Sequence, residues 1–160
     1  MARRIDYYDD PDAPKANSIR PSAGAFVQRE GKILLIQRSD NGNWSMPGGA
    51  QDPGESLTRT AVRETLEESG VHVRVTGLVG IFTDPRHVVH YTSNDEVRQE
   101  FTVIYRADYV DGDATESDES THVGWFTADE IVELRMDPSQ RKRLEWAVSR
   151  EEPYIDPEGD

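Results

Sequence analysis

The sequence predicts a single α/β domain built on a mixed sheet with helices on both of its faces. Two observations indicate strands early in the chain: residues 23–29 are largely apolar, and a second apolar run follows at 33–36. A third observation is a segment from Ser56 to Gly70 with helical periodicity, and two more helical segments come near the end. Strands that surround a central helix favour a layered α/β arrangement.

Composition limits the functions that the chain can have. At 160 residues it is expected to be one domain, and its net charge of −13 argues against a protein that coats nucleic acid. It has no cysteine, which excludes disulfides, zinc thiolates and a thiol nucleophile. Neither a signal peptide nor a membrane-spanning run is present in the sequence, so we expect a cytoplasmic protein with no membrane partner.

Residues 1–20 are polar and interrupted by proline, so we expect an irregular N-terminal arm before a domain that spans residues 21–150. The strands 23–29 and 33–36 flank a turn at 30–32 and predict a hairpin. Ser56 is a suitable N-cap for a helix that runs to Ser69, and Gly70 suits its C-cap. On that helix we expect Val62 and Leu66 to face the core.

The second half of the chain alternates strands with polar segments. Residues 71–82 alternate apolar and polar side chains and predict a half-buried strand, and 101–109 predict the next strand. Between them we expect a loop at 83–98, and the acidic segment 111–119 is expected to be solvated. A strand at 122–126, helices at 129–134 and 139–149, and a disordered acidic tail at 151–160 complete the prediction.

The stretch GGAQDPGESLTRTAVRETLEESGV, residues 48–71, carries the strongest chemical signal. A glycine-rich turn precedes a helix with Glu64, Glu67 and Glu68, whose spacings of three and four place them on one face. Three carboxylates there repel one another unless a cation neutralises them. Mg²⁺ and Mn²⁺ prefer oxygen ligands, so the pattern predicts a divalent metal site.

The same stretch resembles the signature box of the Nudix hydrolases. Gly49, Glu55 and the run Arg63-Glu64-Thr65-Leu66-Glu67-Glu68-Ser69-Gly70-Val71 fill every fixed position, and Thr65 replaces the usual bulky aliphatic residue. The similarity extends to Arg38, Trp44 and residues 46–49 before the box and to 124–126 after it. It implies a Nudix-type α/β/α sandwich, a mixed sheet with the metal-binding helix on one face.

The resemblance also implies an enzyme that hydrolyses the pyrophosphate bond of a nucleoside diphosphate linked to another moiety, with Mg²⁺ or Mn²⁺ as cofactor. Its metal ligands would be Glu64, Glu67 and Glu68, with a carbonyl near Gly48 and with Glu55 as a further ligand or a support for the loop. Arg63, one turn before Glu67, would orient these carboxylates. For the general base we favour Glu119, six residues before Trp125, over the runners-up Glu100 and Glu96.

Four residues outside the helix are candidates for binding a small nucleotide: Arg38, Gly49, Trp44 and Pro85. Pro85 lies close to where members of the family that cleave ADP-ribose carry a proline, so we favour ADP-ribose or another nucleotide sugar. Hydrolysis of nucleoside triphosphates, as in house-cleaning enzymes, is the alternative, and a non-catalytic nucleotide sensor is a third. The Tyr7-Tyr8 pair suggests packing on this domain or on a second copy, which leaves a homodimer open.

Overall fold

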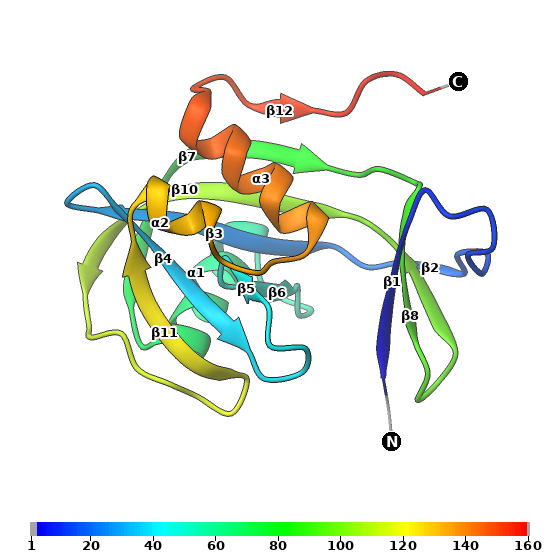
Figure 1. The fold of residues 1–160 in the computed structure, drawn as a ribbon, viewed down its shortest axis with the longest axis horizontal. Helices are drawn as coiled ribbons and strands as arrows, with labels where there is room; N and C mark the ends of the chain where they lie inside the picture. Colours follow the sequence, from blue (N-terminus) through cyan, green and yellow to red (C-terminus); the bar gives the residue numbers. More distant parts are fainter. Residues whose placement is uncertain (1–2, 160) are drawn as a thin grey trace.

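A computed structural model of the protein describes residues 3–159, which form a larger and a smaller sheet with three helices (Figure 1). The helices are α1 (Leu57–Ser69), α2 (Ala128–Val132) and α3 (Pro138–Ser149). The larger sheet contains β3 (Ser22–Arg29), β4 (Lys32–Arg38), β5 (Trp44–Ser45), β6 (Gly48–Ala50), β7 (His72–Phe82), β10 (Thr102–Asp111), β11 (Ser120–Phe126) and β12 (Tyr154–Ile155). The smaller sheet contains β1 (Arg4–Tyr8), β2 (Ser18–Ile19), β8 (His87–Tyr91) and β9 (Glu96–Gln99).

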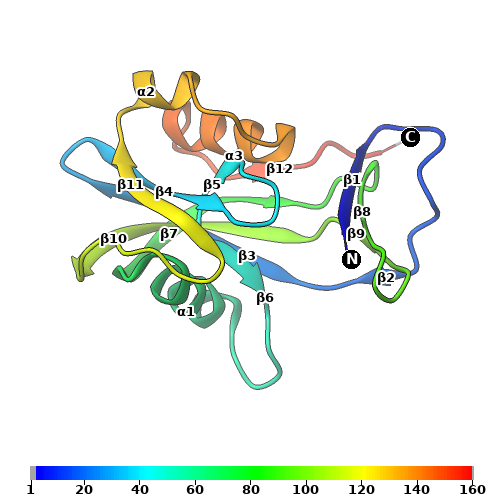
Figure 2. The same ribbon diagram turned by 60° about the horizontal axis from the view of Figure 1, so that its bottom comes forward.

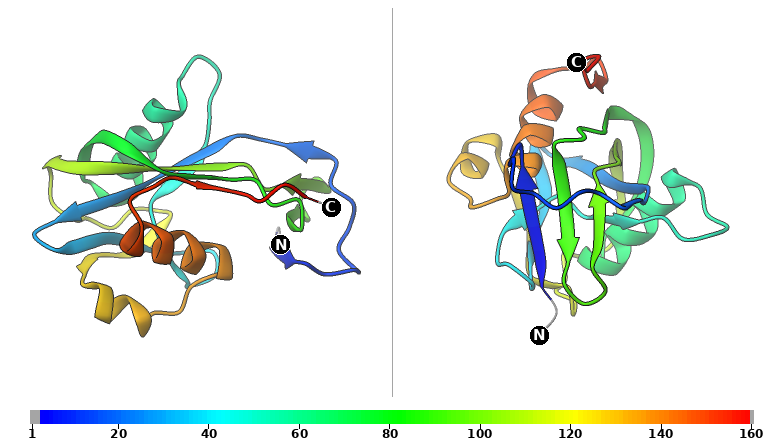
Figure 3. Two further views of the ribbon diagram at one scale, coloured as in Figure 1. Left: turned by 90° about the horizontal axis from the view of Figure 1, so that it is seen from above. Right: turned by 90° about the vertical axis from the view of Figure 1, so that its right-hand side faces the viewer.

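The larger sheet has the strand order β11-β4-β3-β10-β7-β12, and β5 and β6 pair with β4 and β3. Strands β3 and β10 are parallel, whereas β10 and β7 are antiparallel, so the expected mixed sheet is confirmed. Helix α1 covers one face of this sheet, and α2 and α3 lie on the other (Figures 2 and 3). The predicted α/β/α sandwich is therefore the observed one.

Side chains along the central strands point alternately to the two faces of the sheet, so the core has two layers. Phe26 and Leu35 point into the layer beneath α2 and α3, whereas Val27 and Leu34, their neighbours in sequence, point into the layer beneath α1. Successive side chains of a strand face opposite sides of a sheet, so both faces need apolar residues. The continuous apolar run at 33–36 reflects this burial on two sides.

Helix α1 begins and ends where its capping residues predicted. The Ser56 hydroxyl accepts a hydrogen bond from the backbone N–H of Arg59, and Gly70 adopts a left-handed conformation with φ of 77°. The predicted core face was partly wrong, because Leu66 is 48 % exposed. The buried face is instead formed by small and polar residues, including Ala61 and Thr65.

Thr65, which departs from the family pattern, is fully buried against the sheet. Its hydroxyl donates a hydrogen bond of 2.7 Å to the carbonyl oxygen of Ala61, one turn earlier. Burial of an unpaired hydroxyl would be costly, and this bond removes that cost. A threonine therefore fits the close approach of α1 to the sheet.

The N-terminal arm differs from the expected irregular segment. Strand β1 pairs antiparallel with β8, and β2 pairs parallel with β9, so the arm and the segment expected to be a loop at 83–98 form the smaller sheet together. This sheet lies at one end of the larger sheet (Figures 1 and 3). Within the arm, Tyr8 stacks on His87 of the same chain, with ring centroids 4.4 Å apart.

The C-terminal tail also contains a strand where disorder was expected. Strand β12 pairs parallel with the outer edge of β7. The Tyr154 ring stacks on Phe82 at 4.7 Å, and Asp156 accepts a hydrogen bond from the backbone N–H of Thr83. The tail thus covers an open sheet edge, which otherwise exposes unpaired backbone groups.

Among residues 3–159, no helix combines the length and the apolar character that crossing a bilayer requires.

Candidate active site

The glycine-rich turn passes close to the backbone of β3. Gly48 on β6 is paired with Gly24 on β3. A Cβ at Gly48 would lie 2.7 Å from the carbonyl oxygen of Ala23 and 2.8 Å from the Cα of Gly24. Only glycine permits this approach of two backbones. The turn is thereby held against the larger sheet just before α1 begins.

Gly49 makes room for a carboxylate rather than for backbone. A Cβ at this position would lie 2.5 Å from the carboxylate carbon of Glu64. The glycine therefore allows Glu64 to lie directly against the turn. Beside it, the backbone N–H of Gly48 donates a hydrogen bond of 2.8 Å to Oε1 of Glu68.

Three carboxylates converge next to this turn. Glu64 and Glu68 come from α1 and Glu119 from the residue before β11, and one oxygen of each lies within 4.8 Å of the other two. The position of Glu119 follows from strand pairing, because its carbonyl accepts a hydrogen bond of 3.0 Å from the N–H of Ser39, at the end of β4. Residues more than fifty positions apart in the chain therefore share one site.

The electrostatics of this cluster show that its negative charge is poorly compensated within the described residues. Burial raises the pKa of Glu68 to about 8, and Glu64 and Glu119 add to this rise, whereas the Gly48 N–H and Arg38 oppose it. Burial also raises the pKa of Glu64, partly offset by Arg63 and reinforced by Glu67 and Glu119. Both shifts express the cost of bringing like charges together away from water.

Arg63 organises the carboxylates on the other side of the cluster. Its Nε and Nη2 donate to the two oxygens of Glu55 at 3.0 and 2.7 Å. Its Nη1 donates to Glu64 at 3.0 Å and to Glu67 at 3.2 Å. The ion pair expected between Arg63 and Glu67 is therefore present. A guanidinium shared in this way fixes the orientation of several carboxylates at once.

Glu55 and Glu67 lie outside the group of three converging carboxylates. The Arg63 hydrogen bonds lower the pKa of Glu55 to about 2, assisted by the N–H of Asp52 and the Thr60 hydroxyl. Glu55 thus supports the loop, which is one of the two roles expected for it. The Glu67 side chain is 57 % exposed and borders the cluster through Arg63.

The cluster suits a divalent cation. Its donors are carboxylate oxygens, which hard cations such as Mg²⁺ prefer, and they come from two separate elements. The raised pKa values of Glu64 and Glu68 show that a positive charge beside them would be strongly stabilising. Glu64, Glu68 and Glu119 converge where such a charge would lie, and Glu67 borders this group through Arg63.

A cavity adjoins the cluster on the far side of Gly48 and Gly49, both of which line it. Its other walls include Arg38 from the end of β4 and side chains from the smaller sheet. Arg38 and Gly49, two of the four candidate substrate contacts, thus line the cavity. The cavity extends from the turn beside the carboxylates to β1 and β9.

Trp44 and Pro85, the other two candidate substrate contacts, do not line this cavity. The Trp44 ring packs edge-on against Phe126, with centroids 4.9 Å apart, beside the core layer under α2 and α3. Pro85 occupies an exposed turn between β7 and β8. Packing accounts for the position of Trp44, whereas substrate contact by Trp44 or Pro85 stays a prediction.

The two alternative bases, Glu96 and Glu100, form ion pairs outside the carboxylate cluster. Glu96 accepts hydrogen bonds of 2.7 and 2.9 Å from Arg98, which lower its pKa to about 2 together with Ser18. Glu100 is buried, and its pKa is held low because His87 and Arg143 outweigh the effect of burial. Carboxylates stabilised in this way are weak proton acceptors.

Four arginines that line the cavity were not foreseen: Arg4, Arg20, Arg98 and Arg143. The first three lie in segments expected to be irregular. A signal was present, because the run HVVHY at residues 87–91 is rich in residues that favour strands. A strand at residues 87–91 needs a hydrogen-bonded partner, and that partner is β1.

Comparisons with known proteins identify the family. The model of the NUDIX domain matches residues 18–147. A MutT-like protein of Streptomyces ambofaciens is 32 % identical over 133 residues, which cover 83 % of this chain and 79 % of that protein. An ADP-ribose pyrophosphatase of Methanocaldococcus jannaschii is 26 % identical over 70 % of this chain and 64 % of its own length.

Solved structures share the fold. An ADP-ribose pyrophosphatase of Streptococcus suis superposes with a TM-score of 0.66 at 23 % identity, over 87 % of this chain and 100 % of that chain. A MutT NUDIX hydrolase of Burkholderia pseudomallei reaches 0.65 at 27 % identity, over 81 % of this chain and 98 % of that chain. The chain belongs to the Nudix hydrolase family, whose members act on small nucleotides with the help of a divalent metal.

Proposed function

We propose that this enzyme is a Mg²⁺-dependent pyrophosphohydrolase that cleaves a nucleoside diphosphate linked to another moiety, with ADP-ribose or another nucleotide sugar as its substrate. The observation that carries the proposal is the convergence of Glu64, Glu68 and Glu119 beside a cavity bordered by Arg38. A diphosphate needs both a cation and basic side chains, and here the two lie next to each other.

Each residue has a distinct task in the proposed reaction. Glu64, Glu67 and Glu68 hold Mg²⁺, or Mn²⁺ in its place. The bound ion supplies charge shielding for the diphosphate and lowers the pKa of a bound water. Arg63 keeps the carboxylates of Glu64 and Glu67 in place through its hydrogen bonds.

Glu119 is the proposed general base and accepts the proton of the attacking water. It approaches the cluster from outside α1, and its exposed position leaves it in contact with solvent. The commitment of Glu96 and Glu100 to arginine partners supports this choice. Replacement of Glu119 by glutamine is expected to lower kcat about a hundredfold or more, and near-wild-type turnover of that variant would remove Glu119 from this role.

Hydrolysis of nucleoside triphosphates is the second candidate. The observation in its favour is that a putative 8-oxo-dGTP diphosphatase of Bacillus subtilis is 42 % identical to this chain over 66 residues, whereas the ADP-ribose pyrophosphatase from Methanocaldococcus is 26 % identical over 115 residues. The turn and the carboxylate cluster serve both reactions equally. The choice between them therefore depends on the cavity walls.

A substrate panel tests the proposal. The enzyme is incubated with Mg²⁺ and ADP-ribose, a UDP-sugar, the common nucleoside triphosphates and 8-oxo-dGTP, and products are separated by anion-exchange chromatography. ADP-ribose should yield AMP and ribose 5-phosphate at the highest kcat/KM. Rates highest on triphosphates with ADP-ribose inert would favour the second candidate, and no turnover of any compound by an enzyme that binds them would indicate a sensor.

A further inference from the structure

The N-terminal strand contributes one residue to the lining of the cavity. Arg4 on β1 lines the same cavity as Arg38 on β4 and Arg98 on β9. The smaller sheet holds β1 at this end of the molecule (Figure 2). Arg4 and Arg98 come from the sheet that the arm completes, and Arg20 at the end of the arm and Arg143 on α3 also line the cavity. Part of the basic lining is therefore present only when the arm is in place.

Each of these guanidinium groups is held by a carboxylate two residues away in sequence. Nε and Nη2 of Arg4 donate to Asp6 at 2.8 and 3.1 Å, and the same two atoms of Arg38 donate to Asp40 at 2.9 and 2.6 Å. This arrangement uses one edge of the planar group. Among residues 3–159, Nη1 of Arg4 and Nη1 of Arg38 have no hydrogen-bond partner, so donors remain for a ligand.

Arg38 interacts electrostatically with both the carboxylate cluster and β1. Burial and Arg4 both lower the pKa of Arg38, but the bond to Asp40 outweighs them, and Glu68 also raises it. Asp6 and Asp40 partly neutralise the two guanidinium groups, which still repel each other. An anion bound to both groups would offset that repulsion.

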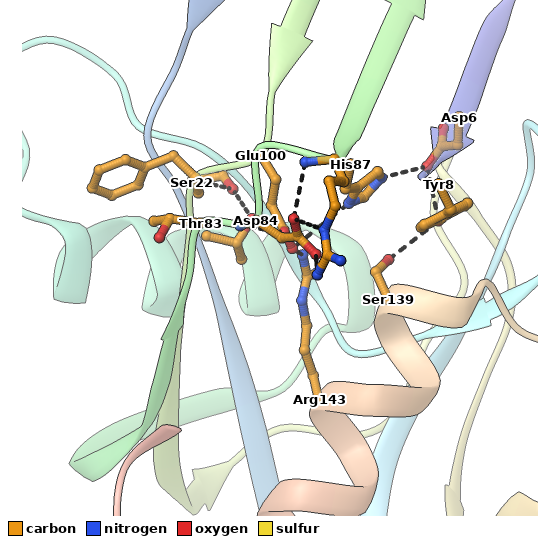
Figure 4. A network of polar contacts seen from close by, with 12 residues as sticks. Asp6, Tyr8, Ser22, Thr83, Asp84, His87, Glu100, Ser139 and Arg143 are labelled. Carbon is orange, nitrogen blue, oxygen red and sulfur yellow. Dashed lines mark hydrogen bonds and ion pairs between the residues drawn. The ribbon is translucent and has the colours of Figure 1, made fainter. Parts of the chain in front are cut away.

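The position of Arg4 is firmly determined. Its partner Asp6 also accepts hydrogen bonds from the Tyr8 hydroxyl at 3.2 Å and approaches Nε2 of His87 at 3.2 Å. The Tyr8 hydroxyl lies 3.3 Å from Oγ of Ser139 on α3, which ties β1 to the main domain (Figure 4). A guanidinium held in this way can bind an anion without a large loss of side-chain entropy.

We propose that Arg4 is a substrate-binding residue, and that Arg4 and Arg38 together bind a phosphate group of the substrate through their Nη1 donors. The proposal rests on the proposed function in taking the ligand to be a diphosphate. A metal ion held by the carboxylates would bind one part of that diphosphate, and the two arginines bind another. The N-terminal strand is then a part of the active site rather than a support for it.

Titration with imidodiphosphate, a diphosphate analogue whose P–N–P bridge resists hydrolysis, tests the proposal without turnover. In the presence of Mg²⁺, Arg4→Gln should weaken the binding of this probe about tenfold or more, as loss of a charged hydrogen bond predicts. With the best substrate of the panel, the same variant should raise KM more than it lowers kcat. Unchanged binding or an unchanged KM would overturn the proposal.

Arg86 provides a matched control. It is clamped by Asp84 in the same manner, with bonds of 3.0 and 3.1 Å, yet it is 64 % exposed and does not line the cavity. Arg86→Gln removes the same charge and should leave probe binding within about twofold of wild type. Equal losses in both variants would show a general effect of charge and would overturn the role of Arg4.

A second variant keeps the proposal testable if Arg4→Gln does not fold. Arg4→Lys retains the charge but has no planar fork with which to hold Asp6 and a phosphate together. It should weaken imidodiphosphate binding about threefold or more, and wild-type affinity in a folded Arg4→Lys protein would contradict the proposal. If no substrate of the panel is cleaved, the proposed function fails, whereas the titration still tests the phosphate site.

Discussion

The α1 region and the smaller sheet border the same cavity but are stabilised by contacts of very different range. Helix α1 is capped by residues adjacent to it in sequence, because Ser56 caps its first turn and Gly70 its last. Strand β1 depends on partners more than eighty residues away, as in the pairing of Arg4 with Tyr91. The reactive carboxylates are mostly on the first element, and the proposed phosphate contact Arg4 is on the second.

Substitutions in the two regions should therefore have different effects. A change within the turn and α1 alters the positions of carboxylates and should act on turnover. A change in the smaller sheet alters the pairing of distant segments and should act on stability and on ligand affinity. The following variants test that division, beginning with the largest expected effect.

Glu68→Gln should lower kcat about a thousandfold, because it removes a buried charge from the three-carboxylate cluster. The glutamine keeps a similar shape and can still accept a hydrogen bond from the Gly48 N–H, so the fold should be retained. Steady-state kinetics and thermal unfolding measure the two effects. Glu145→Gln, on the exposed face of α3, is the control and should change neither.

Gly49→Ala should lower turnover about a hundredfold with little change in stability. The new Cβ would meet the end of the Glu64 side chain, which can move away from the cluster, and a shift of about 1 Å is enough for such a loss. Gly48→Ala is the comparison, since its Cβ would meet backbone atoms of β3 and should destabilise by about 1–3 kcal/mol. Wild-type turnover of Gly49→Ala would contradict the proposed position of Glu64.

His87→Gln should reduce the free energy of unfolding by about 1–3 kcal/mol, and the reduction should depend on pH. Burial lowers the pKa of His87, but the carboxylates of Asp6 and Glu100 outweigh it, so the folded-state pKa lies above its ordinary value of 6.5. The stabilisation by protonated His87 is therefore complete below pH 6.5 and is lost as the pH rises through the folded-state pKa.

Urea denaturation at pH 5.5 and at pH 9 measures this difference. The pKa values of Asp6 and Glu100 are lowered, so both carboxylates stay ionised over this range. The gap between wild type and His87→Gln should be larger at pH 5.5, and a gap that widens towards pH 9 would refute the assignment. His90→Gln, on the same strand but paired with the exposed Asp95, is the control and should have little effect.

Ser56→Ala should give the smallest effect, a destabilisation of about 1 kcal/mol from loss of the N-cap. Ser56→Thr keeps a hydroxyl for the N–H of Arg59 and should restore most of that loss. Because the cap lies at the opposite end of α1 from Glu68, kcat should stay near wild type. A large loss of turnover in Ser56→Ala would show that the helix end and the carboxylate cluster are coupled.

The correct predictions for α1 have local causes, whereas the incorrect one has a tertiary cause. Its ends were predictable because Ser56 and Gly70 act on backbone groups within four residues. Its buried face was not, because the helix lies so close to the sheet that Ala61 and Thr65 fit there, whereas Leu66 remains largely exposed. How deeply a helix residue is buried depends on the surface against which the helix packs. Helical periodicity carries no information about that surface.

The smaller sheet shows the limit of prediction from short windows of sequence. Residues 3–20 and 83–98 are polar, and each looks irregular by itself. Strands β1 and β8 satisfy each other's backbone hydrogen bonds, and His87 joins them through Asp6. Strand β12 at the tail likewise exists only because the edge of β7 accepts it.

The order of residues along the chain was sufficient to specify the glycine-rich turn, the capped helix and the spacing of Glu64, Glu67 and Glu68, because all of these depend on helical geometry over short distances. Only the tertiary structure shows that Glu119, which the family resemblance had suggested, lies within 4.8 Å of Glu64 and Glu68 and that Arg4 lines one cavity with Arg38. These residues come together only when strands far apart in sequence pair. Strand pairing is governed by long-range hydrogen bonds and shared burial.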